Sequence, residues 1–205
     1  MEKHKYVGKT KEAAINNATI DLQEVESNLI INELETTKSG IFKSKKVEIE
    51  VIEKREVKQY IKQCLQKLLK DLGFQANIEI KTNNDIPTYI IYSDNDALLI
   101  GKNGKNLQAL SIVVSQVLKK EIGTTFKFLI DINSYKEKRE HTIESLAKKI
   151  AKEVISTNVE VKLDSMNSYE RRIVHNILSN NNKVYTESVG EEPNRSVVIK
   201  PKKDK

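Results

Sequence analysis

The spacing of apolar residues changes between period two and period 3.6 along the chain, and this predicts the order of strands and helices. In residues 1–55, three short apolar stretches are predicted to be strands: residues 5–7, 29–34 and 47–52. Of these, residues 47–51 are apolar at every second position. Thr10 is placed to cap a helix over residues 11–18. The first segment is therefore predicted to be a small module with one helix and three strands.

Residues 38–46 form a predicted turn between two of these strands. Four lysines in this stretch surround the apolar Ile41 and Phe42, and Gly40 permits a tight change of direction. Two interpretations stay open. The turn is either a solvated hairpin loop or a knob, formed around Gly40 and Phe42, that docks on a partner.

The apolar period changes to 3.6 near residues 53–56, which marks a predicted boundary between modules. From residue 56 to residue 72 the apolar positions follow the spacing of an amphipathic helix, and Gly73 is placed to end it in a left-handed conformation. The pattern then predicts two strands, a short helix, a long helix and a third strand, over residues 76–82, 88–92, 97–100, 105–120 and 126–132.

A glycine-containing loop joins the two helices after the second strand. Its residues are Gly101, Lys102, Asn103, Gly104 and Lys105. The first amides of a helix lack intrahelical partners and carry the positive end of the dipole, so they favour an anion, and the two lysines add full charges. We interpret the loop as a clamp for a nucleic-acid backbone; the alternative is a plain tight turn between helices.

The third segment begins at Ser134 with a long helix up to about residue 156. A strand over residues 159–163, a second helix and two strands over residues 184–188 and 196–200 follow. Asn167 and Glu170 have the spacing of a capping box that opens the second helix. The apolar face of the long helix is predicted to consist of Tyr135, Ile143, Leu146, Ala147, Ile150, Ala151, Val154 and Ile155.

The second helix of this segment carries Arg171 and His175, which project from one face because they are four residues apart. A guanidinium binds phosphate oxygens in a fork, and a neutral imidazole donates one hydrogen bond or stacks on a base. Arg172 and Arg195 are further candidates, although either can instead pair with Glu191 or Glu192. The alternative is that all of these are ordinary surface residues.

The chain has 205 residues and a net charge of +6, and the surplus of positive charge lies in residues 56–133 and 134–205. Such a balance suits a polyanionic partner. The single Cys64 lies on an apolar helix face and is predicted to be a core residue. There is no apolar stretch of the length of a signal peptide or a membrane span. We therefore expect a cytoplasmic protein whose membrane contacts go through a partner.

The sequence offers no arrangement of residues that is typical of catalysis. His4, His141 and His175 are scattered, without the spacing of common zinc sites. The chain lacks the glycine motifs of nucleotide-binding and hydrolase sites. We expect no enzyme activity, no metal, no cofactor and no small-molecule substrate.

Residues 56–133 resemble a type II K-homology (KH) domain, because the order helix, strand, strand, short helix, Gly-x-x-Gly loop, long helix, strand agrees with that family. The resemblance implies that the loop grips the backbone of single-stranded nucleic acid, with Ile100 and Leu107 beside a base-binding groove or in the core. The stretch from Glu170 to Arg195 resembles the R-three-H domain, named for its Arg-x-x-x-His motif. That resemblance implies that Arg171 and His175 contact single-stranded nucleic acid.

The two motifs in this order make the chain similar to the bacterial Jag family, also called the SpoIIIJ-associated or KhpB/EloR family. The fold class is then α+β, with three modules in series over residues 1–55, 56–133 and 134–205. The resemblance implies a link to cell elongation, division and envelope biogenesis. It also implies association with a small KhpA-like KH protein or a second copy, and indirect contact with a membrane insertase. Some members of the family carry a long linker with a phosphorylated threonine, and the very short connection here predicts no such site.

Two functions follow from these expectations. The first is non-catalytic binding of single-stranded RNA, or single-stranded DNA, through the glycine loop and through Arg171, Arg172 and His175. The second is an adaptor for other proteins, whose nucleic-acid binding is secondary. The scarcity of aromatic residues near either motif predicts weak sequence selectivity.

Overall fold

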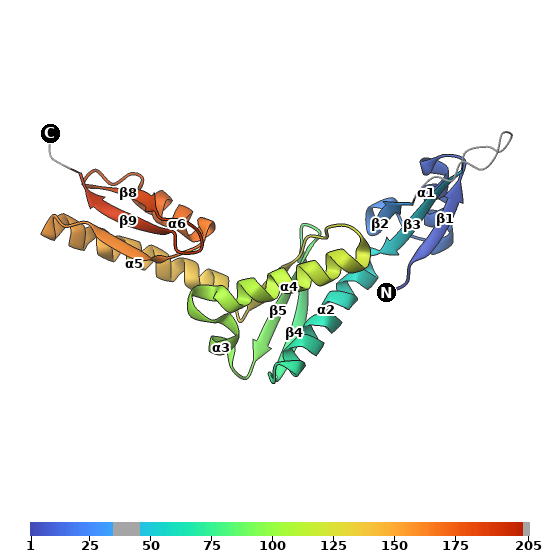
Figure 1. Ribbon diagram of the computed structural model, residues 1–205, viewed down its shortest axis with the longest axis horizontal. Helices are drawn as coiled ribbons and strands as arrows, with labels where there is room; N and C mark the ends of the chain where they lie inside the picture. Colours follow the sequence, from blue (N-terminus) through green and yellow to red (C-terminus); the bar gives the residue numbers. More distant parts are fainter. Residues whose placement is uncertain (35–45, 203–205) are drawn as a thin grey trace. The chain divides into compact units, whose positions relative to one another are not determined.

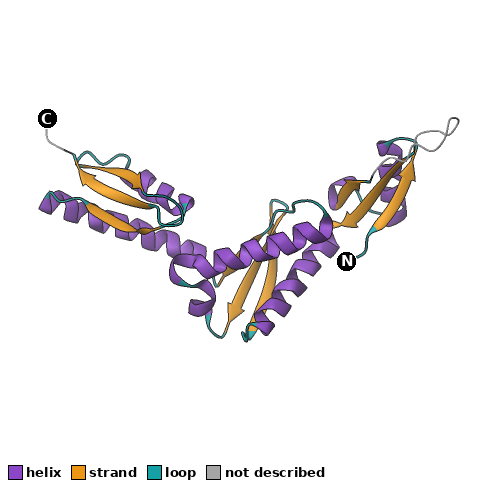
Figure 2. Cartoon of the chain, in the orientation of Figure 1, coloured by secondary structure: helices purple, strands orange, loops and turns teal. Residues whose placement is uncertain are grey.

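The computed structural model describes residues 1–34 and 46–202, so the turn around Gly40 and Phe42 lies outside the described residues. The chain separates into two compact units, Met1–Asn133 and Ser134–Lys205 (Figure 1). The described part contains three small sheets with helices packed against them (Figure 2). The predicted α+β fold class is confirmed.

The first sheet has the strand order β1-β3-β2 and is antiparallel throughout. Its elements are β1 (His4–Gly8), α1 (Lys11–Leu22), the short 3-10 helix η1 (Glu26–Asn28), β2 (Leu29–Glu33) and β3 (Val47–Glu53). The Thr10 hydroxyl accepts a hydrogen bond from the Ala13 amide, as expected of the N-cap. The helix extends four residues beyond the predicted end at Ala18 and stops at Leu22. Small side chains, Ala14 and Ala18, let it pack closely on the sheet.

The helix α2 (Lys54–Asp71) begins directly after β3, so the predicted division after residue 55 falls in its first turn. Its C-terminal end agrees with the expectation: Gly73 has a φ of +86°, and the Gly73 and Phe74 amides donate to the carbonyls of Lys70 and Leu69. This pair of bonds satisfies carbonyls that the end of the helix leaves free.

The second sheet has the order β4-β5-β6, built from β4 (Ala76–Asn83), β5 (Ile86–Ser93) and β6 (Leu129–Ile132). The β4–β5 pair is antiparallel and the β5–β6 pair is parallel. Between β5 and β6 lie α3 (Asp96–Ile100), the 3-10 turn η2 (Lys102–Gly104) and α4 (Lys105–Ile122). This is the element order that the sequence predicted for residues 56–133. Strand β6 is shorter than predicted, and Phe128 before it packs edge-on against the Tyr89 ring at 6.0 Å.

The second unit contains α5 (Tyr135–Thr157), β7 (Val161–Ser165), α6 (Ser168–Leu178), β8 (Val184–Val189) and β9 (Ser196–Pro201). Its sheet has the order β7-β9-β8 and is antiparallel. Both helices contribute to one core with the sheet. Two residues predicted for this core, Leu146 and Ile155, are instead 39% and 38% exposed, because the apolar stripe of α5 is wider than the face that the rest of the unit covers.

In the described ranges, 1–34 and 46–202, no helix has the length and the apolar character that crossing a membrane requires.

Candidate nucleic-acid interface

The glycine loop between α3 and α4 takes its shape from three residues with positive φ. Gly101, Asn103 and Gly104 have φ values of 71°, 54° and 76°. Gly101 combines this φ with a ψ of 175°, a region that is open essentially to glycine alone. A Cβ at Gly101 would also lie 2.5 Å from Cγ of Asn106. The loop therefore requires glycine at position 101 because of its backbone conformation, and a Cβ there would also displace the Asn106 side chain.

Three amides of the loop are already used within it. The Gly101 amide donates to the Ala97 carbonyl at 3.0 Å, and the Gly104 amide donates to the Gly101 carbonyl at 3.1 Å. The Lys105 amide donates to the Lys102 carbonyl. The helix start in the sequence predicted outward-pointing amides, and for these three that prediction is wrong, because the chain winds a 3-10 turn between the two helices.

The side chains of the loop are more accessible than its amides. Lys102 and Lys105 are both exposed, and neither forms an ion pair with any residue of the described ranges. Asn106, also exposed, donates to the Leu98 carbonyl at 2.8 Å and ties α4 to α3. The loop thus presents two ammonium groups on a backbone that is fixed by its own hydrogen bonds.

Of the two alternatives for the apolar residues beside the loop, groove or core, the structure favours the core for Leu107. Leu107 is 5% exposed and belongs to the core, whereas Ile100 is half-buried. Leu98 on α3 is 59% exposed, and the sequence analysis did not single it out. The signal for it was weak, because a helix of five residues is too short for its apolar period to distinguish a buried from an open position.

The second candidate surface is built on the first turn of α6. The Asn167 side chain accepts from the Glu170 amide at 3.0 Å, and Glu170 Oε2 accepts from the Asn167 amide at 3.1 Å, which confirms the predicted capping box. Glu170 is only 5% exposed, and its Oε1 accepts from Arg139 Nε of α5 at 2.8 Å. Arg139 was not identified from the sequence, since the contact joins two helices that are far apart in the chain.

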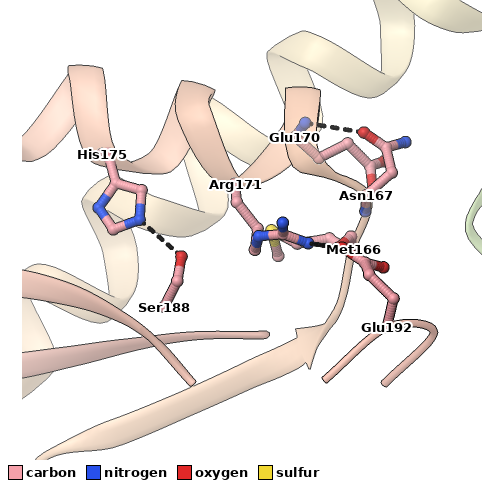
Figure 3. Close-up of polar contacts among 7 residues, drawn as sticks. All are labelled: Met166, Asn167, Glu170, Arg171, His175, Ser188 and Glu192. Atoms are coloured by element: carbon pink, nitrogen blue, oxygen red, sulfur yellow. Dashed lines mark hydrogen bonds and ion pairs between the residues drawn. The ribbon is translucent and has the colours of Figure 1, made fainter. Parts of the chain in front are cut away.

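Arg171 is buried, contrary to the expectation of a guanidinium that is open to phosphate. Its Nη1 donates to the Met166 carbonyl at 2.9 Å and to Glu192 Oε1 at 2.7 Å (Figure 3). The predicted partners of Glu191 or Glu192 were Arg172 and Arg195. The acceptor Glu192 was thus among the candidates, but the donor is Arg171. Arg171 faces inward because its position on α6 points toward the loop that precedes β9.

His175 lies on the same side of α6 and bridges two hydroxyls of β8. Its Nδ1 is 2.6 Å from Thr186 Oγ1 and its Nε2 is 2.9 Å from Ser188 Oγ (Figure 3 shows the latter contact). Burial, and then the nearby charge of Arg171, lowers the pKa of His175 below its usual value. The ring is therefore neutral at physiological pH, with one nitrogen donating and the other accepting. Thr186 and Ser188 share a face of β8 because they are two residues apart.

The remaining arginines have different environments. Arg172 is exposed, and within residues 1–34 and 46–202 it forms no ion pair. Arg195 is half-buried, and its Nε is buried without a hydrogen-bond partner in the described part of the chain. In the same part of the chain there is no cluster of three or more His, Cys, Asp or Glu residues that could hold a metal ion.

The second unit matches a known domain family. Residues 141–201 match the R-three-H domain family, and this range includes Arg171, His175, Thr186, Ser188 and the loop with Glu192. The second unit is thus an R-three-H domain, and the resemblance drawn from its Arg-x-x-x-His spacing is confirmed.

The chain belongs to the KhpB (Jag) family, as the sequence predicted. It is 33% identical over 200 residues to "RNA-binding protein KhpB" of Clostridium symbiosum, a match that covers 96% of this chain and 90% of the relative. The protein of the same name from Bacillus subtilis is 32% identical over 166 residues, with 80% of each chain covered. The Lactiplantibacillus plantarum protein is 34% identical over 132 residues, which are 64% of this chain and 41% of the relative.

Proposed function

We propose that this chain is a non-catalytic protein that binds single-stranded RNA through two surfaces. The first is the glycine loop with the exposed Lys102 and Lys105. The second is the surface at α6 formed by the exposed Arg172 together with the neighbouring face that carries Arg171 and His175. The observation that carries the proposal is the pair of exposed lysines, without acidic partners in the described part of the chain, on a loop whose backbone is held in one conformation. The names of the KhpB relatives and the match to the R-three-H family support it.

The loop in this proposal binds phosphates mainly by charge. Because three of its amides already donate within the loop, Lys102 and Lys105 supply the principal contacts, with Gly101, Asn103 and Gly104 as the scaffold that spaces them. Phosphate contacts of this kind position a strand without reading its sequence. The exposed Leu98 adds an apolar surface next to the loop on which a base can lie. Weak sequence selectivity follows.

On the second surface, the proposal assigns direct contact to Arg172 and an indirect role to His175. Both nitrogens of His175 are used by Thr186 and Ser188, so the ring holds β8 against α6. Arg172 is exposed and available to a phosphate. Two modest surfaces on one chain raise the joint affinity, because binding at one increases the effective concentration at the other.

The test is a double charge reversal, Lys102→Glu with Lys105→Glu, measured by fluorescence anisotropy on a labelled oligouridine. A matched control reverses Lys119 and Lys120, which are exposed at the other end of α4. We expect the loop variant to lose about tenfold or more in affinity, since each lost phosphate contact costs on the order of 0.7 kcal/mol or more. Equal losses in the two variants would mean that only the overall charge matters and would reject the loop.

A second candidate function is an adaptor for other proteins, which an apolar groove in the first unit favours. The groove has a volume of about 370 Å³ and is lined by α2 and α4, with Val113 and Val117 at 47% and 39% exposure. The proposed occupant of the groove is a small KhpA-like KH protein or a second copy of this chain. Through such contacts the protein, which we propose to be cytoplasmic, would reach a membrane insertase and influence cell elongation and division. Val113→Glu with Val117→Glu should abolish association and leave RNA binding intact; loss of both would contradict a separate surface.

A further inference from the structure

Glu192 stands between the buried Arg171 and the solvent. The Arg171 side chain is 9% exposed, whereas the Glu192 side chain, 2.7 Å from it, is 59% exposed. Arg171 Nη1 also donates to the Met166 carbonyl at 2.9 Å (Figure 3). The guanidinium therefore has one contact inside the protein and one with an anion that reaches into water.

We propose that Glu192 is an internal competitor for RNA phosphate: its carboxylate occupies the position at Arg171 that a phosphate group takes when RNA binds. This inference rests on the proposed function, because it requires that the α6 surface meets RNA. Carboxylate and phosphate oxygens accept hydrogen bonds from a guanidinium in the same geometry, so one can replace the other. The chain thus carries, beside its own motif arginine, a group that lowers the affinity of that arginine for nucleic acid.

The loop around Glu192 allows this exchange without unfolding. The Met166 amide donates to the Arg195 carbonyl at 3.1 Å, and the Asn194 amide donates to the Glu191 carbonyl at 2.8 Å. These backbone bonds fix the loop independently of the Glu192 side chain. An ion pair with a partner that is more than half exposed is weak because water screens it. The side chain can therefore rotate into solvent when a phosphate arrives.

Two polar side-chain atoms that follow this loop in the chain have unused hydrogen-bonding capacity. Arg195 Nε and Ser196 Oγ are buried and have no hydrogen-bond partner among the residues that the structure describes. Arg195 is tied to Met166 through the backbone, and Met166 in turn accepts from Arg171. When Glu192 leaves, the buried guanidinium of Arg171 loses its carboxylate, so the charge of a phosphate is favourable there.

The experiment compares Glu192→Gln with Glu191→Gln in the full chain. Both substitutions remove one negative charge from the same loop, but Glu191 is exposed and, in the described ranges, has no ion pair. Binding of labelled oligouridine is measured by anisotropy at about 0.1 M salt, where charges more than about 10 Å apart are largely screened. We expect Glu192→Gln to bind about two- to fivefold more tightly than the wild type, and Glu191→Gln to change affinity by less than about 1.5-fold.

Glu192→Ala is the second variant, in case glutamine retains the contact with Arg171, and thermal unfolding of each variant checks that it is folded. Equal affinities for the Glu191 and Glu192 variants would overturn the competition and leave the proposed function standing. Weaker binding by the folded Glu192 variants would also overturn it, since the carboxylate would then help binding. Absence of salt-dependent binding in the wild type would reject the proposed function, and the competition with it.

Discussion

Removing the buried carboxylate of Glu170 is expected to destabilise the second unit strongly. It closes the capping box with Asn167 and accepts from Arg139 Nε at 2.8 Å, and only 5% of the residue is exposed. Glu170→Ala therefore removes an N-terminal cap contact of α6 and leaves the Arg139 charge without its carboxylate.

Both losses have known magnitudes. A lost helix cap costs about 1 kcal/mol, and breaking a fully buried ion pair costs about 3–5 kcal/mol. The Arg139 side chain is 21% exposed, so water can partly solvate the orphaned guanidinium and the second figure is an upper bound. We expect Glu170→Ala to lower the free energy of unfolding by about 2–4 kcal/mol. For a domain of this size the shift in Tm is about 10 °C or more.

Differential scanning calorimetry of the full chain measures this effect, with Glu140→Ala as the matched control. Glu140 is adjacent to Arg139 and accepts a surface hydrogen bond from the Tyr169 hydroxyl at 3.1 Å, so its loss should cost about 1 kcal/mol or less. The double variant Arg139→Ala with Glu170→Ala should lose less stability than the sum of the two single variants, because removing both partners leaves neither charge unpaired. A loss below about 1 kcal/mol for Glu170→Ala would refute the reasoning.

The remaining predictions concern the loop and the histidine. Gly101→Ala should destabilise the first unit by about 2 kcal/mol or more and weaken RNA binding. The backbone at this position has a conformation that is open essentially to glycine alone, and the new Cβ would lie 2.5 Å from Cγ of Asn106. Gly73→Ala, at a φ of +86° with open space around it, should cost about 1 kcal/mol and leave binding unchanged; equal costs in urea unfolding would contradict the packing argument. The pKa of His175 is lowered in the folded state, so the unfolded state binds the proton more readily and stability falls as the pH drops through and below about 6.5. In the wild type, the Tm of the second unit should therefore fall between about pH 7.5 and 5.5, and His175→Gln should reduce this fall. If Tm depends on pH in the same way in both proteins, His175 is not the source of the fall.

Much of the architecture could be predicted from the sequence because the local signals agree with the fold. The alternation in β3, the amphipathic pattern of α2 and the capping box of α6 each determine their element through contacts between residues close in the chain. The structure differs most clearly from the predictions where packing between distant elements determines whether a side chain is buried. Leu146 and Ile155 fit the apolar period of α5 but face solvent, because the period says nothing about how wide the covering surface is.

The candidate sites were harder to predict in detail than the fold. The sequence located the glycine loop, but it did not indicate that the Gly101, Gly104 and Lys105 amides are used internally, since this depends on the 3-10 turn. It also brought Arg171 forward as an exposed phosphate ligand, whereas the structure buries it against Met166 and Glu192. Helical spacing tells which residues share a face, but a loop distant in the chain decides whether that face is open.

In the proposed function, Lys102 and Lys105 neutralise phosphates of a single strand. The most direct measurement is the dependence of RNA affinity on salt for the wild type and for Lys102→Glu with Lys105→Glu. Each neutralised phosphate of a single strand contributes about 0.7 to the slope of log K against log salt concentration. The account predicts that the slope of the variant is shallower by about 1.4, one such contribution for each lysine. An unchanged slope together with an unchanged affinity would contradict it.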